Sequence, residues 1–178
     1  PADPDAWRGW LESGGTLLLW DLGPDGLAAW NEVLAAQIEL VELAHPVYHL
    51  VRAETAHGPT AILAGLSNED TCWLENWQYT RGNRKETIAS HLLEPSVGRQ
   101  LLTNAPRAGL DVLFGDERSS ERERMVAMSH YLDADPPPTL GGLVEVPVGR
   151  GRALICQAHW RPDKWQFRRL LGTLLWNL

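Results

Sequence analysis

The fold of this chain is decided by residues 13–20, which read Ser-Gly-Gly-Thr-Leu-Leu-Leu-Trp. The run Thr16–Trp20 is apolar after its first residue, and such a continuous run is typical of a strand buried on both faces. Ser13, Gly14 and Gly15 stand directly before it and are typical of the end of a helix, which we place over residues 4–12. The chain therefore begins with a helix, a tight turn and an interior strand.

The segments that follow alternate between helix and strand. Residues 21–24 form a turn into a helix over residues 25–37, whose apolar positions repeat at helical spacing. A strand over residues 38–43 and an extended piece over residues 47–52 come next. This strand–turn–helix–strand order predicts a mostly parallel sheet covered by helices.

The C-terminal part of the chain predicts a hairpin and a last helix. Residues 142–147 and 152–158 are apolar runs that flank the turn Gly149-Arg150-Gly151, which is the pattern of a β-hairpin. An amphipathic helix follows over residues 163–176. The fold class we expect is α/β: a three-layer, flavodoxin-like domain with a mostly parallel sheet and a C-terminal hairpin plus helix.

The middle of the chain is less regular. A long stretch without clear periodicity covers residues 53–86, a strand is expected over residues 87–93, and a charged, exposed helix over residues 118–131. The sequence holds no internal repeat and no second apolar core. A length of 178 residues fits one domain. We therefore expect residues 1–178 to form a single domain, and the start at Pro1 leads us to expect a piece of a longer polypeptide.

Composition excludes several classes of function. The net charge of −7 argues against a nucleic-acid partner, because phosphate binding needs a basic face. No apolar run approaches the ~20 residues of a membrane span, so we expect a soluble protein without a membrane partner. Two distant cysteines, Cys72 and Cys156, form neither a disulfide scaffold nor a zinc site. His45 and His49 are separated by Pro46 and the other histidines are scattered, so no metal site is expected. No glycine-rich loop is followed by Lys-Ser or Lys-Thr, so no cofactor is expected.

Nine tryptophans in 178 residues suggest a binding surface as well as a core. The first candidate site lies in the long irregular stretch and combines aromatic rings with planar polar groups that suit a sugar or a protein interface: Trp73, Asn76, Trp77, Tyr79 and Arg81. The alternative is a loop anchored by its own tryptophans. A second candidate is Trp20 with Asp21, because open α/β sheets bind ligands at the carboxyl ends of their strands.

Three segments of the chain resemble a known family. They are residues 12–19 (Glu-Ser-Gly-Gly-Thr-Leu-Leu-Leu), 62–70 (Ile-Leu-Ala-Gly-Leu-Ser-Asn-Glu-Asp) and 146–157 (Val-Pro-Val-Gly-Arg-Gly-Arg-Ala-Leu-Ile-Cys-Gln). Together they resemble the class I glutamine-amidotransferase-like domain that occurs as an accessory or C-terminal domain of large bacterial glycoside hydrolases, including β-galactosidase-type enzymes. The resemblance implies a bacterial, cytoplasmic protein and a first family strand that lies before Pro1.

The same resemblance implies that the amidotransferase chemistry is missing. The family's nucleophile is a Cys on a sharp strand-to-helix turn, and the corresponding residues 19–23 contain no Cys. Near the C-terminus His159 echoes the family's Gln-x-His-x-Glu, but Arg161 stands in place of the carboxylate. Cys72 lies between Asp70 and Glu75, whose negative charges disfavour a thiolate. We therefore expect no catalytic site within the chain.

The function that follows is a non-catalytic accessory domain of a glycoside-hydrolase-type protein. Its role would be oligomerisation, interdomain packing or shaping of a carbohydrate site, with other domains or subunits of the enzyme as partners. A stand-alone glycoside hydrolase stays open as an alternative, with Asp21, His159 or loop carboxylates as its working groups. So does a carbohydrate-binding module that uses the tryptophans. Glycosidases need two carboxylates across a sugar, and no local motif pairs Asp21, Asp70, Glu75 or Glu94.

Overall fold

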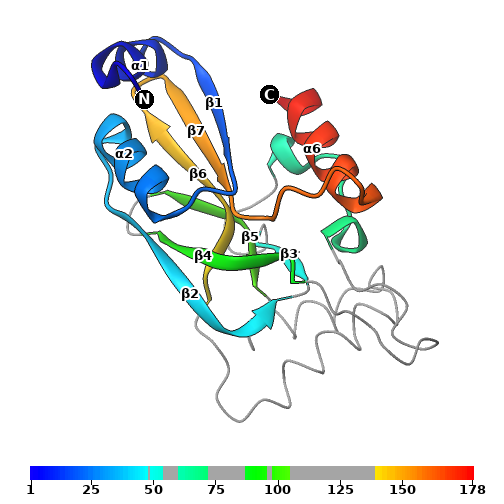
Figure 1. Cartoon of the computed structure of the whole chain (residues 1–178). Coiled ribbons are helices and arrows are strands. Elements are labelled where there is room, and N and C mark those ends of the chain that lie inside the picture. Colours follow the sequence, from blue (N-terminus) through cyan, green and yellow to red (C-terminus); the bar gives the residue numbers. More distant parts are fainter. Residues whose placement is uncertain (48, 54–59, 72–86, 96–97, 105–138) are drawn as a thin grey trace, which may run out of the picture.

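A seven-stranded mixed sheet with helices on both faces forms the centre of the molecule (Figure 1). The computed structural model describes residues 1–47, 49–53, 60–71, 87–95, 98–104 and 139–178. The strands are β1 (Thr16–Trp20), β2 (Ile38–Val47), β3 (Leu50–Arg52), β4 (Ala89–Pro95), β5 (Arg99–Asn104), β6 (Gly141–Val148) and β7 (Gly151–Cys156). The helix predicted over residues 118–131 lies outside the described residues.

The sheet is mixed, and the prediction of a mostly parallel sheet was wrong. Its order is β1-β7-β6-β4-β2, with β5 pairing β6 and β3 pairing β5. Only the pair β1–β7 is parallel, whereas the other described pairs are antiparallel. The strand–helix–strand order occurs once, at β1–α2–β2, and β2 does not return beside β1. It lies instead at the other end of the path, antiparallel to β4.

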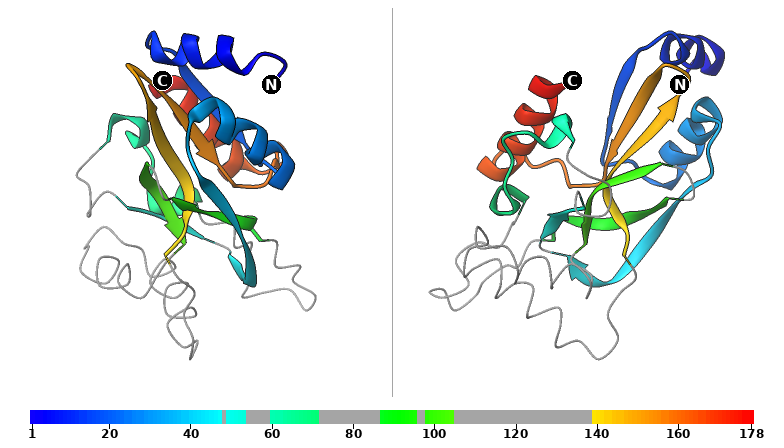
Figure 2. Two further views of the ribbon diagram at one scale, coloured as in Figure 1. Left: turned by 90° about the vertical axis from the view of Figure 1, so that its left-hand side faces the viewer. Right: turned by 180° about the vertical axis from the view of Figure 1, so that it is seen from behind.

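Three helices of the described chain divide between the two faces of the sheet (Figure 2). Helices α1 (Pro4–Glu12) and α2 (Pro24–Leu34) pack on one face, and α6 (Trp165–Asn177) packs on the other. Strand β7 contributes to both cores in alternation, because successive side chains of a strand point to opposite faces. Ala153 and Ile155 face α1 and α2, whereas Leu154 and Cys156 face α6. No described helix is long and apolar enough to cross a membrane.

Strand β1 is less buried than its sequence predicts. Within the described residues it pairs with β7 alone, at one end of the strand path. Leu19 is its one buried residue, and Leu17 and Leu18 are half-buried. Both faces of the strand contact the cores, with Leu17 and Leu19 on the α1–α2 side and Leu18 and Trp20 on the α6 side. Burial is nevertheless only partial, and the second edge of the strand has no partner in the described chain.

The hairpin β6–β7 and the C-terminal helix were predicted correctly. The two strands are joined by Gly149 and Arg150, and Gly149 takes the left-handed conformation that a two-residue turn requires (φ 58°). The turn is fastened to the end of α1, where the Arg150 N–H donates to the Glu12 carbonyl at 3.2 Å. The approach is so close that a Cβ on Gly151 would lie 2.2 Å from the carbonyl oxygen of Gly15.

Helix α2 ends three residues before the predicted boundary. Ala35 adopts a left-handed conformation (φ 49°), which turns the chain out of the helix. The Asn31 amide then pairs with the backbone of Ile38 in both directions, at 2.8 and 3.3 Å. These bonds fix the start of β2, which runs on to Val47 and is longer than expected.

The stretch predicted as irregular contains two short 3₁₀ helices that hold α6 in place, η1 (Ala61–Leu63) and η2 (Asn68–Thr71). The Asn177 amide donates to the Ile62 and Ala64 carbonyls, at 3.0 Å each. Arg169 of α6 donates to the Gly65 carbonyl at 2.6 Å. Segment 60–71 therefore fixes the position of α6 through these hydrogen bonds.

Candidate functional site

The most distinctive arrangement of polar groups begins where β1 ends. The Asp21 N–H donates to the Cys156 carbonyl at 2.8 Å and so continues the pairing of β1 with β7. Asp21 is left-handed (φ 49°), a conformation that Asp tolerates better than most residues because its side chain can bond locally. The chain thereby turns sharply from β1 into α2, which begins at Pro24. The Asp21 carboxylate is left at the carboxyl end of the strand.

This carboxylate bonds to the segment that follows β7. Its Oδ2 accepts a hydrogen bond from the Trp160 N–H at 3.1 Å, and its Oδ1 lies 3.4 Å from His159 Nδ1. The backbone of His159 is fixed as well, since its N–H donates to the Ile88 carbonyl at 2.7 Å. Both residues are therefore held by backbone bonds as well as by their side-chain contact.

A third group, which the sequence analysis did not single out, completes the arrangement. Ser90, the second residue of β4, places its Oγ 3.0 Å from His159 Nε2. A carboxylate, an imidazole and a hydroxyl are thus joined in that order, from the ends of β1 and β7 and the start of β4. The side chains of Asp21 and His159 are 35% and 30% exposed, and Ser90 is exposed, so solvent and small molecules reach all three.

An aromatic cluster borders these groups. The rings of Trp20, Trp160 and Phe167 meet edge to face, with centroids 4.9 to 6.3 Å apart. Trp20, predicted as a binding residue, packs against the core on the α6 face, and its buried Nε1 has no hydrogen-bond partner among the described residues. Trp160 is 56% exposed and offers the open ring surface beside His159. Its position could be found only from the fold.

Arg161 and Cys156, which lie close to the positions compared with the amidotransferase motif, have structural roles. Arg161 binds both carboxylate oxygens of Asp163, at 3.0 and 2.8 Å, which lowers the pKa of Asp163 to about 2. Cys156 is fully buried, and burial, with a smaller contribution from the negative charge of Asp21, raises the pKa of its thiol to about 12. A thiol in that state is not a nucleophile.

The first predicted site lies outside the described residues. All five of its members fall in residues 72–86: Trp73, Asn76, Trp77, Tyr79 and Arg81. Of the other carboxylates considered for glycoside hydrolysis, Asp70 accepts hydrogen bonds from Ser67 and lies 3.6 Å from Arg169. Glu94 stands opposite Glu39 on the neighbouring strands β4 and β2, and Glu75 lies outside the described residues. Among described residues, no group of three or more His, Cys, Asp or Glu side chains could hold a metal ion.

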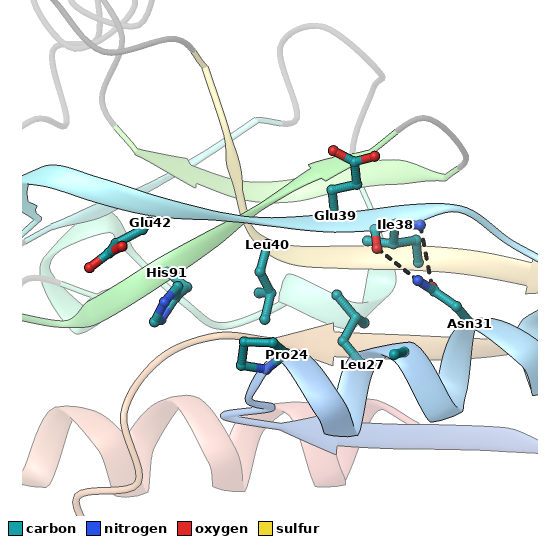
Figure 3. Close-up of a pocket in the computed structure, with 9 residues that line it drawn as sticks. Pro24, Leu27, Asn31, Ile38, Glu39, Leu40, Glu42 and His91 are labelled. Carbon is teal, nitrogen blue, oxygen red and sulfur yellow. Dashed lines mark hydrogen bonds between the residues drawn. The ribbon is translucent and has the colours of Figure 1, made fainter.

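A cavity of about 450 Å³ lies between α2 and strands β2 and β4 (Figure 3). Its wall is formed by Pro24, Leu27, Ala28, Asn31, Ile38, Glu39, Leu40, Glu42 and His91. It is therefore on the α2 face of the sheet. His91, which follows Ser90 in β4, lines this cavity, while Ser90 meets His159. The cavity is thus separate from the Asp21–His159–Ser90 arrangement.

Searches against models of protein families, against curated proteins and against solved structures found no match.

Proposed function

We propose that the chain is a class I glutamine-amidotransferase-like accessory domain of a bacterial glycoside-hydrolase-type protein, three-layered and flavodoxin-like in outline. Its role is assembly: it packs against another domain or subunit and helps to shape a carbohydrate site. The observation that carries this proposal is that β1 is an apolar, only partly buried strand at the end of the described sheet.

An apolar edge strand is a surface that proteins usually cover. Its free side presents unpaired backbone N–H and C=O groups, and soluble proteins protect such edges with charges, proline or another element. Residues 16–20 contain no charge and no proline, and Leu17 and Leu18 are only half-buried. A neighbouring domain or subunit that adds a strand or a helix beside β1 would bury this edge.

Helix α6 adds aromatic surface to the same proposal. Its outward residues include Trp165, Leu175 and Trp176, which are 54%, 58% and 89% exposed. Exposed tryptophan is enriched at protein interfaces, where it supplies much of the binding energy. An accessory domain that docks through such groups would show little tendency to stay monomeric when it is separated from its partner.

The turn at Asp21 supports two parts of the proposal. Its position supports a relationship to the amidotransferase-like family, and its residues support the loss of amide-transfer activity. The resemblance places the family's nucleophilic Cys on a sharp strand-to-helix turn near a His. Here Asp21 occupies such a turn with a left-handed backbone and lies beside His159. Residues 19–23 contain no Cys, so the thiolate that amide transfer in this family requires is absent from the turn.

The experiment that tests the assembly role is sedimentation velocity of the chain over a range of concentrations. We expect reversible self-association of the isolated chain, because the edge of β1 and the exposed apolar residues of α6, as far as the structure describes the chain, can contact one another between two copies. The double variant Trp165→Gln plus Trp176→Gln should shift the association midpoint at least about tenfold, since two exposed aromatic anchors contribute about 1 kcal/mol or more each. Arg150→Gln, a substitution of an exposed side chain in the β6–β7 turn, serves as the control. A chain that stays monomeric at every concentration would contradict the proposal.

The sugar-related part of the proposal needs its own measurement. Tryptophan fluorescence is followed during titration with mono- and oligosaccharides, and the same samples are assayed for released sugar. The accessory role predicts no release, and any binding should weaken in Trp73→Ala plus Trp77→Ala. Saturable binding by a strictly monomeric chain would favour a carbohydrate-binding module instead, and released sugar would show a glycoside hydrolase.

A further inference from the structure

We propose that Ser90, His159 and Asp21 form an acyl-transfer site that hydrolyses small carboxylic esters. This activity is separate from the accessory role and departs from the expectation that the chain holds no catalytic site. Ser90 is the nucleophile, His159 the general base, and Asp21 the residue that positions the imidazole. The inference rests on the order and the spacing of these three side chains.

The two contacts of His159 are those that nucleophile activation requires. Ser90 Oγ lies 3.0 Å from Nε2, within reach for transfer of the hydroxyl proton. Nδ1 lies 3.4 Å from the Asp21 carboxylate, which favours the tautomer with hydrogen on Nδ1 and leaves Nε2 free to accept. The second distance is long, as such contacts often are before substrate binds. The same logic of carboxylate, imidazole and hydroxyl recurs on unrelated folds.

The arrangement is held by the ends of three strands. Asp21 is fixed through its N–H to Cys156 and through its Oδ2 to the Trp160 N–H. The backbone of His159 is fixed to Ile88, which lies two residues before Ser90 on the same chain segment. A shift of β4 relative to β7 would therefore move the base and the nucleophile together. Sites supported by such regular elements keep their geometry better than sites on free loops.

Accessibility and the neighbouring surface indicate the substrate class. Ser90 is exposed, so an acyl group can approach its Oγ from solvent. The indole of Trp160, 56% exposed, follows His159 directly and offers a flat apolar surface. An ester whose alcohol part has a flat apolar face, such as an aromatic ring or a pyranose, would pack there. The substrate is therefore an ester of such an alcohol.

The reaction is balanced with water as the one co-substrate. Ser90 Oγ forms a bond to the ester carbonyl carbon as its proton passes to His159 Nε2. The bond from that carbon to the alkoxide oxygen then breaks, and the proton moves from Nε2 to the leaving alcohol. Water adds to the acyl-serine with His159 again taking the proton, the bond to Oγ breaks, and Oγ regains its proton as the carboxylic acid leaves.

Two probes test the site on the chain as it stands. A fluorophosphonate reports a reactive serine by covalent labelling, and peptide mapping locates the modified residue. p-Nitrophenyl acetate reports turnover, and the time course shows whether a burst of acylation precedes it. We expect labelling at Ser90. We also expect Ser90→Ala to lower hydrolysis about a hundredfold or more, because without the nucleophile the proton transfer to His159 is lost too, and general base catalysis alone contributes at least about a hundredfold.

Matched variants separate the site from background chemistry. Ser13→Ala is the control for Ser90→Ala, because Ser13 is also an exposed serine that makes one hydrogen bond. Asp21→Asn retains an acceptor for the Trp160 N–H but loses the charge, so the acylation rate should fall about tenfold or more with an unchanged KM and only a small shift of the unfolding midpoint. Such a result distinguishes a positioning role from a purely structural one.

The outcomes that overturn the proposal are equally defined. No labelling of Ser90 above the level at Ser13, in a wild-type chain whose circular dichroism is that of a folded protein, would exclude a reactive serine. Hydrolysis that is retained in Ser90→Ala and lost in His159→Gln would assign the rate to the imidazole alone. Neither result depends on whether the chain self-associates, so the failure of this site and the failure of the accessory role are distinguishable.

Discussion

Replacing Asp21 measures how much the turn at the end of β1 contributes to stability. The wild-type carboxylate makes two contacts, to the Trp160 N–H at 3.1 Å and to His159 at 3.4 Å, and its backbone is left-handed. Three substitutions separate these contributions. Asn keeps an acceptor and tolerates the backbone, Gly loses both contacts but relaxes the backbone, and Ala loses both contacts and strains the backbone.

The expected losses follow from the geometry. The bond to Trp160 is worth about 1 kcal/mol, and the half-exposed contact to His159 about 0.5 kcal/mol. A left-handed Ala adds about 1 kcal/mol of strain. We therefore expect the free energy of unfolding to fall by about 0.5 kcal/mol in Asp21→Asn, about 1.5 kcal/mol in Asp21→Gly and about 2.5 kcal/mol in Asp21→Ala.

Urea denaturation followed by tryptophan fluorescence gives these differences by linear extrapolation. In a domain of this size the Ala variant should also melt about 5–10 °C below the wild type. Equal stability of the Gly and Ala variants would show that the left-handed backbone at Asp21 is not maintained in solution. Wild-type stability in all three variants would show that the contacts of the Asp21 carboxylate do not contribute to the free energy of unfolding.

Three further predictions have defined outcomes. Gly151→Ala should lower stability by about 3 kcal/mol, because its Cβ would lie 2.2 Å from two backbone oxygens, whereas Gly9→Ala, with open space around it, should be neutral or stabilising in the same urea assay. Ala35→Gly should raise the melting temperature by about 1–3 °C, since glycine adopts the left-handed end of α2 without strain; a decrease would contradict that conformation. The pKa of Cys156 is raised to about 12, so the unfolded chain loses its thiol proton first and stability falls as pH rises above about 9. Between pH 8.5 and 10.5 the wild type should lose about 2 kcal/mol more than Cys156→Ala, and equal losses would refute a buried neutral thiol.

Local patterns in the sequence predicted the elements far better than their pairing. The apolar run at residues 16–20, the turn at Gly149 and the amphipathic C-terminal residues each specify one element, and each is present. Strand β5 was not predicted, because residues 99–104 mix polar and apolar groups without a clear period. The parallel sheet was inferred from a single strand–helix–strand unit. Which strands become neighbours depends on contacts between distant segments, and the local pattern does not contain them.

For the candidate site, too, the sequence predicted individual residues but not which of them meet in space. Asp21 was singled out by its place at a strand end, and His159 by its resemblance to a family motif. Nothing in the sequence connected the two, and Ser90 carries no local signal, since an isolated serine in a strand is common. The three meet only because the starts and ends of β1, β4 and β7 converge. The aromatic ring open to ligands is that of Trp160, while the neighbouring Trp20 packs into the core.

The pairing of β1 with β7 has a consequence for the order of events on the ribosome. Thr16 is opposite Arg152, so nearly the whole chain must be made before β1 meets its partner in the described sheet. At a translation rate of about 5–20 residues per second, on the order of ten seconds pass between the synthesis of Leu17–Leu19 and the synthesis of β7. During that time an uncharged, apolar segment is open to other chains or to chaperones. A truncation before Gly151 would prolong this exposure indefinitely, so nascent chains stalled there should aggregate sooner than chains that lack only α6.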